Sequence, residues 1–357
     1  MKNKTKFIII ILASITFLIN IILKKFPYII EKYYSLFINK ITIQVISSIT
    51  GLVPFSIAEF LIIILAVILI ILFVLVLFSF KTNRFLQNFI NLCTYISVLY
   101  ILFMFLWGFN YNRLSFDKIA GLDIKKSSTK DLYDLCENLI NRANVLSKEV
   151  NRDSKGIVNI NYKDAFIRAQ KGYEKAGEIY PELSYKYGIP KKILFSKLMS
   201  YTGITGIYIP YTCEANVNVN ITEFTIPSTV AHEMAHQRGF AREDEANYIA
   251  YLTCTMHPDK DFQYSGIMLA LVYSMNELYK NDIEGFNVLK VKYSDLVKKD
   301  LIYDKKFWEK YEGKAQKISN NINNTYLKSN GQKDGVQSYG RMVDLLIAEN
   351  KQLFPKK

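Results

Sequence analysis

The chain has 357 residues, of which 50% are hydrophobic, and 45 Lys and Arg against 32 Asp and Glu give a formal net charge of +13. The hydrophobic content excludes a disordered chain, and 8 Pro with 16 Gly exclude a collagen-like composition. Four cysteines without a C-x-x-C pair exclude a disulfide-built scaffold and a cysteine zinc ribbon.

Three uncharged stretches near the N-terminus predict membrane spans. Phe7–Leu23 contains 17 uncharged residues and Phe60–Phe80 contains 21, nearly all of them apolar. Phe85–Phe109 is more polar, but it ends in aromatic residues typical of a membrane interface. Because a bilayer core about 30 Å thick requires about 20 helical residues, we expect transmembrane helices at about 7–23, 60–80 and 85–109, with the lipid bilayer as a partner.

The flanks of these stretches predict how the chain sits in the membrane. Asn20-Ile-Ile-Leu-Lys-Lys is a poor signal-peptidase context, so we expect an uncleaved anchor. Lysines at the N-terminus and the basic Lys81–Arg84 connection favour the cytoplasm, although the intervening segment is also basic. With three spans, the residues after 113 then lie outside the cytoplasm. The sequence predicts a multi-pass protein of the cell membrane with an extracytoplasmic domain.

Beyond a membrane domain over residues 1–113, alternating charge and helical periodicity predict a soluble domain over 114–357. Ser128 and Asp131 predict a capped helix start. Over 207–221, Asn alternates with Val and Ile, which predicts a strand. We therefore expect a mainly α fold, with three N-terminal transmembrane helices and a mostly helical domain with a small sheet. Further helices are predicted over about 161–178, 189–200, 262–280, 284–299, 305–328 and 336–348.

Two of the three histidines, His232 and His236, lie in an H-E-x-x-H pattern. Helical residues four apart share one face, about 6 Å apart along the axis, so both imidazoles can bind one ion. Glu233 projects beside them, where it can accept a proton from an activated water instead of binding metal. Two histidines on a polar helix face are the simpler alternative. The scarcity of histidine favours a zinc site.

A catalytic zinc site needs a third protein ligand and an open position. Glu243 and Glu245 follow the metal helix, and a second helix over about 242–256 would place each of them on a buried face. Periodicity therefore does not choose between them. Alternatively, both pair with Arg238 and Arg242 as charges at a helix start.

The segment Glu243-Asp-Glu-Ala-Asn resembles the E-x-x-A-[D/N] element that follows H-E-x-x-H in glutamate-zincin metallopeptidases. The resemblance implies that Glu243 is the third zinc ligand, with Glu245 less favoured. It also implies that Asn247 supports one of the ligand histidines. The spacing departs from that clan, because only six residues separate the second histidine from Glu243. The position of the third histidine of metzincins is Arg242 here.

The run from Ile204 to Leu252 is also similar to an uncharacterised family of bacterial multi-span membrane proteins assigned to the zincin-like peptidase clan. The similarity extends over the N-terminal spans and over Gln337–Arg341. It implies a zincin-like α+β domain after the spans and zinc chemistry, and it supplies no substrate.

Three weaker candidates accompany the zinc site. His257 is a lone histidine before a proline, a pattern more typical of a solvated loop. The strand predicted over 207–221 is either an ordinary strand or an edge that pairs with an extended peptide. Tyr339 and Arg341 are candidates to stabilise an oxyanion, although packing and surface charge are the more usual roles of such residues.

These features predict a membrane-anchored zinc metallopeptidase with a peptide or protein substrate. One zinc ion held by His232, His236 and Glu243 would activate water, and Glu233 would act as general base. The alternative is a non-catalytic zinc-binding membrane sensor or scaffold.

The positive charge does not indicate nucleic acid, because no binding motif is present and the lysines are scattered. Anionic lipid headgroups are the simpler partner for it.

Overall fold

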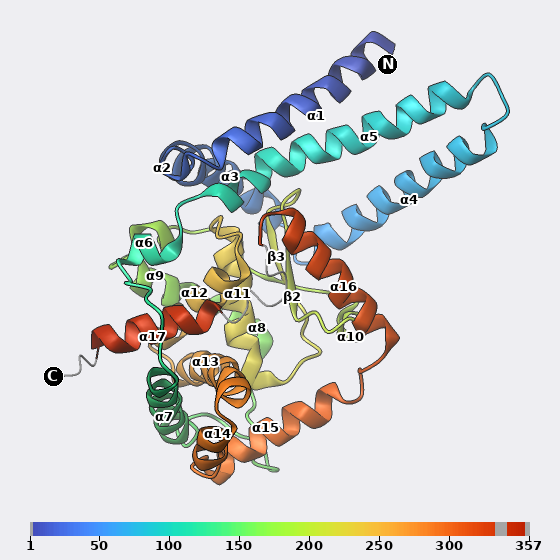
Figure 1. Cartoon of the computed structure of the whole chain (residues 1–357). Coiled ribbons are helices and arrows are strands. Elements are labelled where there is room, and N and C mark those ends of the chain that lie inside the picture. The colour runs from blue at the N-terminus through green and yellow to red at the C-terminus, as the bar shows by residue number, and fades with distance from the viewer. Residues whose placement is uncertain (1–2, 333–340, 354–357) are drawn as a thin grey trace.

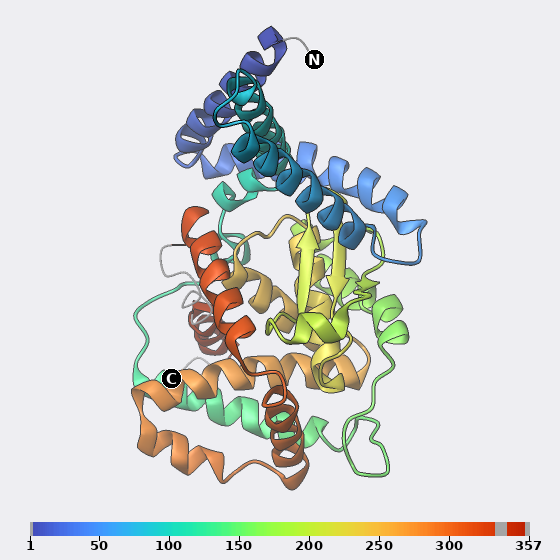
Figure 2. The same ribbon diagram turned by 90° about the vertical axis from the view of Figure 1, so that its right-hand side faces the viewer.

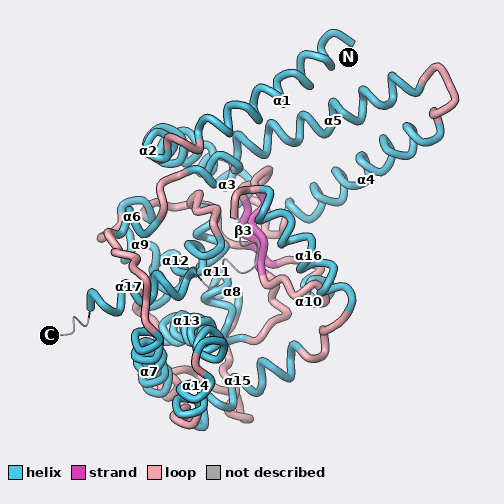
Figure 3. Tube along the Cα trace, in the orientation of Figure 1, coloured by secondary structure: helices cyan, strands magenta, loops and turns pink. Residues whose placement is uncertain are grey.

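The computed structural model describes residues 3–332 and 341–353, to which all structural statements refer. Most of this part of the chain is helical, and it contains a small three-stranded sheet (Figure 3). Three candidate membrane helices near the N-terminus precede a mostly helical soluble domain (Figure 1). The predicted fold class is therefore confirmed.

Three helices are long and apolar enough to cross a membrane: α1 (Asn3–Leu23), α4 (Ile57–Phe78) and α5 (Phe85–Leu106). Helix α5 packs against both α1 and α4. All three extend from one end of the soluble domain (Figures 1 and 2). Helix α5 ends three residues before the predicted boundary, because the chain turns at Trp107 into the 3-10 helix η2 (Gly108–Asn112).

The soluble domain is built around a bundle in which α11 and α12 pack against each other and against α13. Helix α7 packs along α13, and its start has the predicted capping box at Ser128. The helices of the domain are α6 (Phe116–Ala120), α7 (Thr129–Leu146), α8 (Tyr162–Arg168), α9 (Gln170–Gly177), η3 (Pro181–Leu183), α10 (Ser196–Ser200), η4 (Glu223–Thr225), α11 (Ile226–Gln237), α12 (Glu243–Thr255), α13 (Lys260–Asn281), α14 (Ile283–Lys290), α15 (Asp295–Trp308), α16 (Lys314–Ser329) and α17 (Arg341–Leu353).

Several predicted helix boundaries were wrong. The helix expected over 161–178 is two helices, α8 and α9. A new helix begins within the range 284–299, because the Ser294 hydroxyl accepts a hydrogen bond from the Val297 amide and caps α15. Helix α16 then starts after Gly313. The first part of the helix predicted over 336–348 lies outside the described residues.

The segment between the first two spans forms a nearly continuous helical rod of α2 (Pro27–Ile29), the π-helix η1 (Ile30–Asn39) and α3 (Lys40–Gly51). Its polar face is buried against η2. The Ser35 hydroxyl donates to Asn110 Oδ1 at 2.8 Å, and the Asn110 amide donates to Asn39 Oδ1 at 2.8 Å. Because buried polar groups require partners, this network fixes the rod on η2, directly after α5.

A buried ion pair extends this contact to the end of α11. The Arg113 guanidinium donates to Glu31 through Nε at 2.9 Å and through Nη2 at 2.5 Å. Its Nη1 donates to the carbonyl of Arg238 at 3.1 Å, and the guanidinium lies 3.8 Å from the centre of the Phe240 ring. One cation therefore joins the rod between the spans to the turn that follows α11.

The sheet has the order β1-β3-β2, with β1 (Lys191–Lys192) parallel and β2 (Gly206–Ile209) antiparallel to β3 (Glu214–Val217). Gly206 is opposite Val217, and Ile209 is opposite Glu214. Helix α11 packs against β2 and β3, so the sheet covers the metal-motif helix. Strand β2 is at the edge of the sheet.

The single strand predicted over 207–221 is instead a hairpin followed by a loop. Cys213 has a φ of 53° in the turn between β2 and β3. The chain leaves the sheet after Val217, because the Asn218 side chain donates to Ser200 Oγ at 3.1 Å and also accepts from the Asn220 amide at 2.9 Å. Asparagine side chains that bind nearby backbone and hydroxyl groups compete with a strand ladder.

The helix predicted over 189–200 is present only as α10. The carboxylate of Glu59, in the first turn of α4, accepts hydrogen bonds from the amides of Leu194 at 2.7 Å and Phe195 at 3.1 Å. These amides are therefore bound by a membrane-anchored carboxylate before the helix begins. A contact between distant segments overrides the local helical pattern.

The Arg113–Glu31 pair gives a stability prediction. Arg113→Met leaves the Glu31 carboxylate buried without its cation, which should cost about 3–5 kcal/mol in the free energy of unfolding. Thermal unfolding of the full chain in detergent measures it. Adding Glu31→Leu to this variant should restore much of the loss, since an apolar pair leaves no charge unpaired.

The matched control is Lys175→Ala, which breaks a pair with Glu178 whose side chains are 56% and 65% exposed. An exposed pair of this kind contributes less than about 1 kcal/mol. If Arg113→Met and Lys175→Ala shift the unfolding midpoint equally, the buried pair has no special structural role.

Candidate metal centre

The predicted metal helix and the acidic helix after it form a tight helical pair. Helix α11 begins with proline in its first turn and ends at Gln237, and α12 begins at Glu243 and packs against α11. Gly239 in the connecting turn has a φ of 80°, and an added Cβ would lie 3.2 Å from Asn110 Oδ1 and 3.3 Å from Arg113 Nη1. Both the left-handed backbone and the lack of space therefore require glycine.

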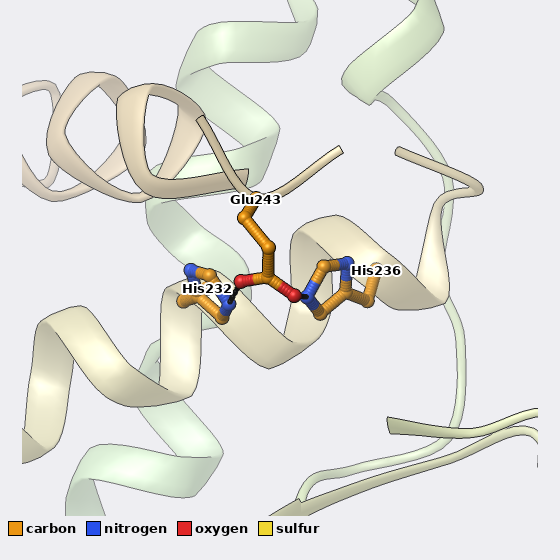
Figure 4. A group of neighbouring side chains, drawn as sticks. All are labelled: His232, His236 and Glu243. Carbon is orange, nitrogen blue, oxygen red and sulfur yellow. Dashed lines mark ion pairs between the residues drawn. The ribbon is translucent and has the colours of Figure 1, made fainter. Parts of the chain in front are cut away.

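This turn brings His232, His236 and Glu243 together (Figure 4). Nε2 of His232 lies 3.3 Å from Oε2 of Glu243, and Nε2 of His236 lies 3.6 Å from Oε1. One nitrogen or oxygen from each residue lies within 4.8 Å of the others. In Figure 4 both imidazoles, on α11, point toward the carboxylate on α12.

The three side chains fit a zinc ion. Two ligands at 2.0–2.1 Å from a tetrahedral ion are about 3.3 Å apart. The histidine nitrogens here lie 3.3 and 3.6 Å from the carboxylate oxygens of Glu243, close to that separation. Two histidines and one glutamate are a donor set of catalytic zinc sites that keep an open position. The side chains of His232 and Glu243 retain 16% and 18% exposure, whereas His236 retains 8%. Solvent therefore reaches the cluster.

The electrostatics of the cluster favour a cation. Burial raises the pKa of Glu243, but hydrogen bonds and charge attraction from the two imidazoles hold this pKa well below its usual range. Burial lowers the pKa of His236, but the Glu243 carboxylate outweighs that effect and raises it to about 9. A half-buried carboxylate that stays ionised between two imidazoles provides negative charge for a metal ion.

His236 is oriented by groups that the sequence did not indicate. Its Nδ1 lies 2.7 Å from the carbonyl oxygen of Phe240, and its ring meets the Trp107 ring edge-on with centroids 5.6 Å apart. The Phe240 carbonyl accepts a proton from Nδ1, which leaves Nε2 as the ring nitrogen that faces Glu243 and that could bind a metal ion after losing its proton. A backbone carbonyl has no sequence signature. Trp107 was interpreted only as a membrane-interface residue.

Glu233 lies beside the cluster and outside its ligand set. It is 3% exposed, and its Oε2 is buried without a hydrogen-bond partner among the described residues. Burial raises the pKa of Glu233 to about 7, against the lowering effect of His232 and His236. An added Cβ on Gly206 of β2 would lie 2.7 Å from Cγ of Glu233. The carboxyl is therefore held between the edge strand and the two histidines.

The structure places Glu245 away from the cluster. Its Oε1 accepts a hydrogen bond from the Phe116 amide at 2.9 Å and forms an ion pair with Arg242 at 2.7 Å. The helix-start pairing that was an alternative for both glutamates thus holds for Glu245 and Arg242. Arg238 instead donates to backbone carbonyls, including that of Leu183 at 2.9 Å. No four-ligand site containing both glutamates is formed.

Asn247 is buried on α12 and interacts with the Tyr273 hydroxyl. Within the described parts of the chain, no hydrogen bond joins it to either imidazole. The support implied for Asn247 is supplied, for His236, by the Phe240 carbonyl. The Tyr273 hydroxyl has a raised pKa, mainly through burial and also through the nearby charge of Glu243.

The weaker candidates have other positions. His257 is buried and not solvated, which corrects the prediction. Its Nε2 lies 3.0 Å from the carbonyl of Arg168, and its ring stacks on Phe262 with centroids 3.8 Å apart. Arg341 lies 3.3 Å from a carboxylate oxygen of Asp244. Tyr339 lies outside the described residues.

Two tyrosines complete the surroundings of the cluster and were not predicted. The hydroxyl of Tyr111 in η2 donates to that of Tyr326 in α16 at 3.0 Å. Burial raises the pKa of Tyr111 well above its usual value, and the charge of Glu243 adds to the effect. Helix α16 extends from this pair toward the segment before β2, where Gln316 approaches Gly203 (Figure 1). Both tyrosines lie 90 residues or more from the H-E-x-x-H motif, which hid them from sequence reasoning.

Because Glu243 faces the two histidines and Glu245 does not, substitutions of the two glutamates should affect metal binding differently. The purified full chain should hold about one zinc ion, and Glu243→Gln should reduce this to a small fraction because the carboxylate charge is lost. Glu245→Gln, on the same helix, should keep the full metal content. Elemental analysis after dialysis measures both. Loss of metal in the Glu245 variant with retention in the Glu243 variant would reverse the assignment.

Comparison with known proteins gives a family. The model of the family described as "Protein of unknown function (DUF3810)" matches residues 34–347. No curated protein and no solved structure matches the chain. The match covers most of the rod between the spans, two of the three spans, the sheet and the candidate metal centre. The chain therefore belongs to the DUF3810 family.

Proposed function

We propose that this protein is a membrane-anchored zinc-dependent metallopeptidase of the zincin-like clan. The observation that carries the proposal is the convergence of His232, His236 and Glu243 beside the buried, unpartnered carboxylate oxygen of Glu233. A structural zinc site would be closed by four protein ligands. Glu245, which could have closed this one, is held by Arg242. This arrangement supports hydrolysis over the sensor or scaffold alternative.

Each residue then has a distinct role. His232, His236 and Glu243 would hold the metal, and a bound zinc ion would polarise a scissile carbonyl and lower the pKa of water to about 7. Glu233 removes the proton from the attacking water and delivers it to the leaving amine. Its pKa of about 7 suits both steps, because a carboxyl that titrates near the operating pH can accept and return a proton.

Strand β2 provides a place for an extended peptide substrate. It lies at the edge of the sheet, and its first residue, Gly206, touches Glu233. A peptide that paired with this edge as an added strand would pass next to the general base.

Glu233→Gln tests the mechanism. The amide cannot accept the proton, so cleavage of a mixed-sequence fluorogenic peptide library by the full chain should fall about 10²–10⁴-fold, as expected for loss of a general base. Zinc content should be unchanged, because Glu233 is not a ligand. Unaltered cleavage by a metal-loaded Glu233→Gln protein would falsify the proposed role.

Gly206→Ala gives a second test at the same carboxyl. The new methyl group would overlap the Glu233 side chain and displace it, so kcat should fall while zinc content remains about one per chain. Gly313→Ala is the matched control, since an added Cβ there has no atom within 4 Å and the backbone is extended. Equal activity of the two variants contradicts the close approach of β2 to Glu233.

A further inference from the structure

We propose that the site cleaves polypeptide segments held at the bilayer surface, next to the point where a substrate chain leaves the membrane. The inference rests on the proposed peptidase function and on the membrane location of α1, α4 and α5. Four independent contacts place the metal cluster and its edge strand at the membrane end of the soluble domain.

The first contact joins a ligand directly to a span. Trp107 is the residue immediately after α5, and its ring lies 5.6 Å from that of His236. Tryptophan at the end of a span is typical of the headgroup level. The His236 imidazole is therefore one side chain away from the membrane interface.

The second contact is the rod formed by η1 and α3. Its polar side is buried against the end of α5, η2 and Arg113 through Ser35, Asn39 and Glu31. Helix α3 also contacts the soluble domain, where the Ser47 hydroxyl accepts from the Gly188 amide at 3.1 Å and the Thr50 hydroxyl donates to the carbonyl of Thr212 at 3.1 Å. Its other side is apolar and exposed, at positions three or four residues apart, which is the pattern of a helix that lies in the membrane interface. The exposed side chains are Phe37, Ile38, Ile41, Val45, Ile49 and Leu52, from 48% to 83% exposed.

The third contact places a further apolar group beside α4. Leu194, Phe195 and Leu198 are exposed by 49%, 54% and 67% on the soluble domain. The amides of the first two bind the carboxylate of Glu59 in the first turn of α4. These side chains are thus fixed at the base of a span, where burial in lipid would remove them from water.

The fourth contact shows the direction of the proposed substrate strand. The carboxylate of Glu214, in β3, accepts from the amides of Ile57 and Ala58 at the start of α4, at 3.3 and 2.7 Å. In the hairpin turn after β2, the Tyr211 hydroxyl donates to the carbonyl of Leu99 within α5 at 3.1 Å. Leu99 is about two helical turns before the end of α5, so the hairpin tip reaches the span itself. Figure 2 shows the strands running toward the spans.

A peptide paired with β2 therefore has one end directed at the bilayer. Such geometry suits the juxtamembrane segment of a membrane-anchored protein, in which extended chain is available within a few residues of the lipid. A site far from the membrane would require a much longer spacer, because an extended residue spans at most about 3.6 Å.

Spacer length tests the inference. The full chain, reconstituted in phosphatidylcholine–phosphatidylglycerol vesicles, is given fluorogenic mixed-sequence peptides that carry an N-terminal palmitoyl chain. The spacer between lipid and peptide is about 5 or about 30 flexible residues, so that both peptides are concentrated at the surface and only their reach differs. We expect the short-spacer peptide to be cleaved at least as fast as the long-spacer peptide.

Cleavage confined to the long spacer overturns the juxtamembrane inference and leaves the peptidase function intact. Absence of cleavage with every peptide, in protein that holds zinc, overturns the peptidase function and the inference with it.

A second measurement does not depend on activity. In a Cys93→Ser background, nitroxide labels are attached to Val45→Cys on the apolar side of α3 and to Asp295→Cys, whose side chain is fully exposed at the start of α15. In the same vesicles, the label at 45 should be accessible to oxygen and protected from a water-soluble nickel chelate. The label at 295 should show the reverse. Equal access of the nickel chelate to both labels contradicts an interfacial α3.

Discussion

The structure depends on one buried cation at the junction between the membrane segment and the metal helix. Arg113 neutralises Glu31, binds the carbonyl of Arg238 and stacks on Phe240. The same turn contains Gly239, which has no room for a side chain against Asn110 and Arg113. Because the turn sets the angle between α11 and α12, the contacts of Arg113 and Gly239 determine whether Glu243 faces the two histidines.

The arrangement makes the membrane segment part of the site. The carbonyl that orients His236 belongs to Phe240, and the Arg113 guanidinium lies over the ring of this phenylalanine. The indole beside His236 belongs to Trp107, directly after α5. Strand β3, which supports the edge strand, also caps the start of α4 through Glu214. Contacts of this kind are buried and directional, so the cluster and the spans are expected to behave as one rigid unit.

The chemistry of the cluster follows from how burial and charge are balanced. Glu243 remains ionised because hydrogen bonds and charge attraction from the two imidazoles lower its pKa, whereas the same imidazoles only partly offset the burial of Glu233, whose pKa is about 7. In the proposed function, two carboxyl groups on neighbouring helices would therefore take different roles from their surroundings, one as a metal ligand and one as a base. Glu245, on the same turn of α12, is neutralised by Arg242 and takes neither role.

The sequence by itself determined the features that depend on local spacing. Uncharged stretches long enough for a bilayer predicted the three candidate spans, and H-E-x-x-H predicted a helix with His232 and His236 on one face. Periodicity could not choose between Glu243 and Glu245, because each lies on a helix face that is apolar enough to be buried. Only the tertiary fold decided this, through the angle of the turn after α11.

The site also contains residues from distant segments of the chain, namely Trp107, Tyr326 and Gly206. The hairpin in place of a long strand was also set by long-range contacts, since the hydrogen bonds of Asn218 reach Ser200. Such contacts leave no periodic trace in a single sequence.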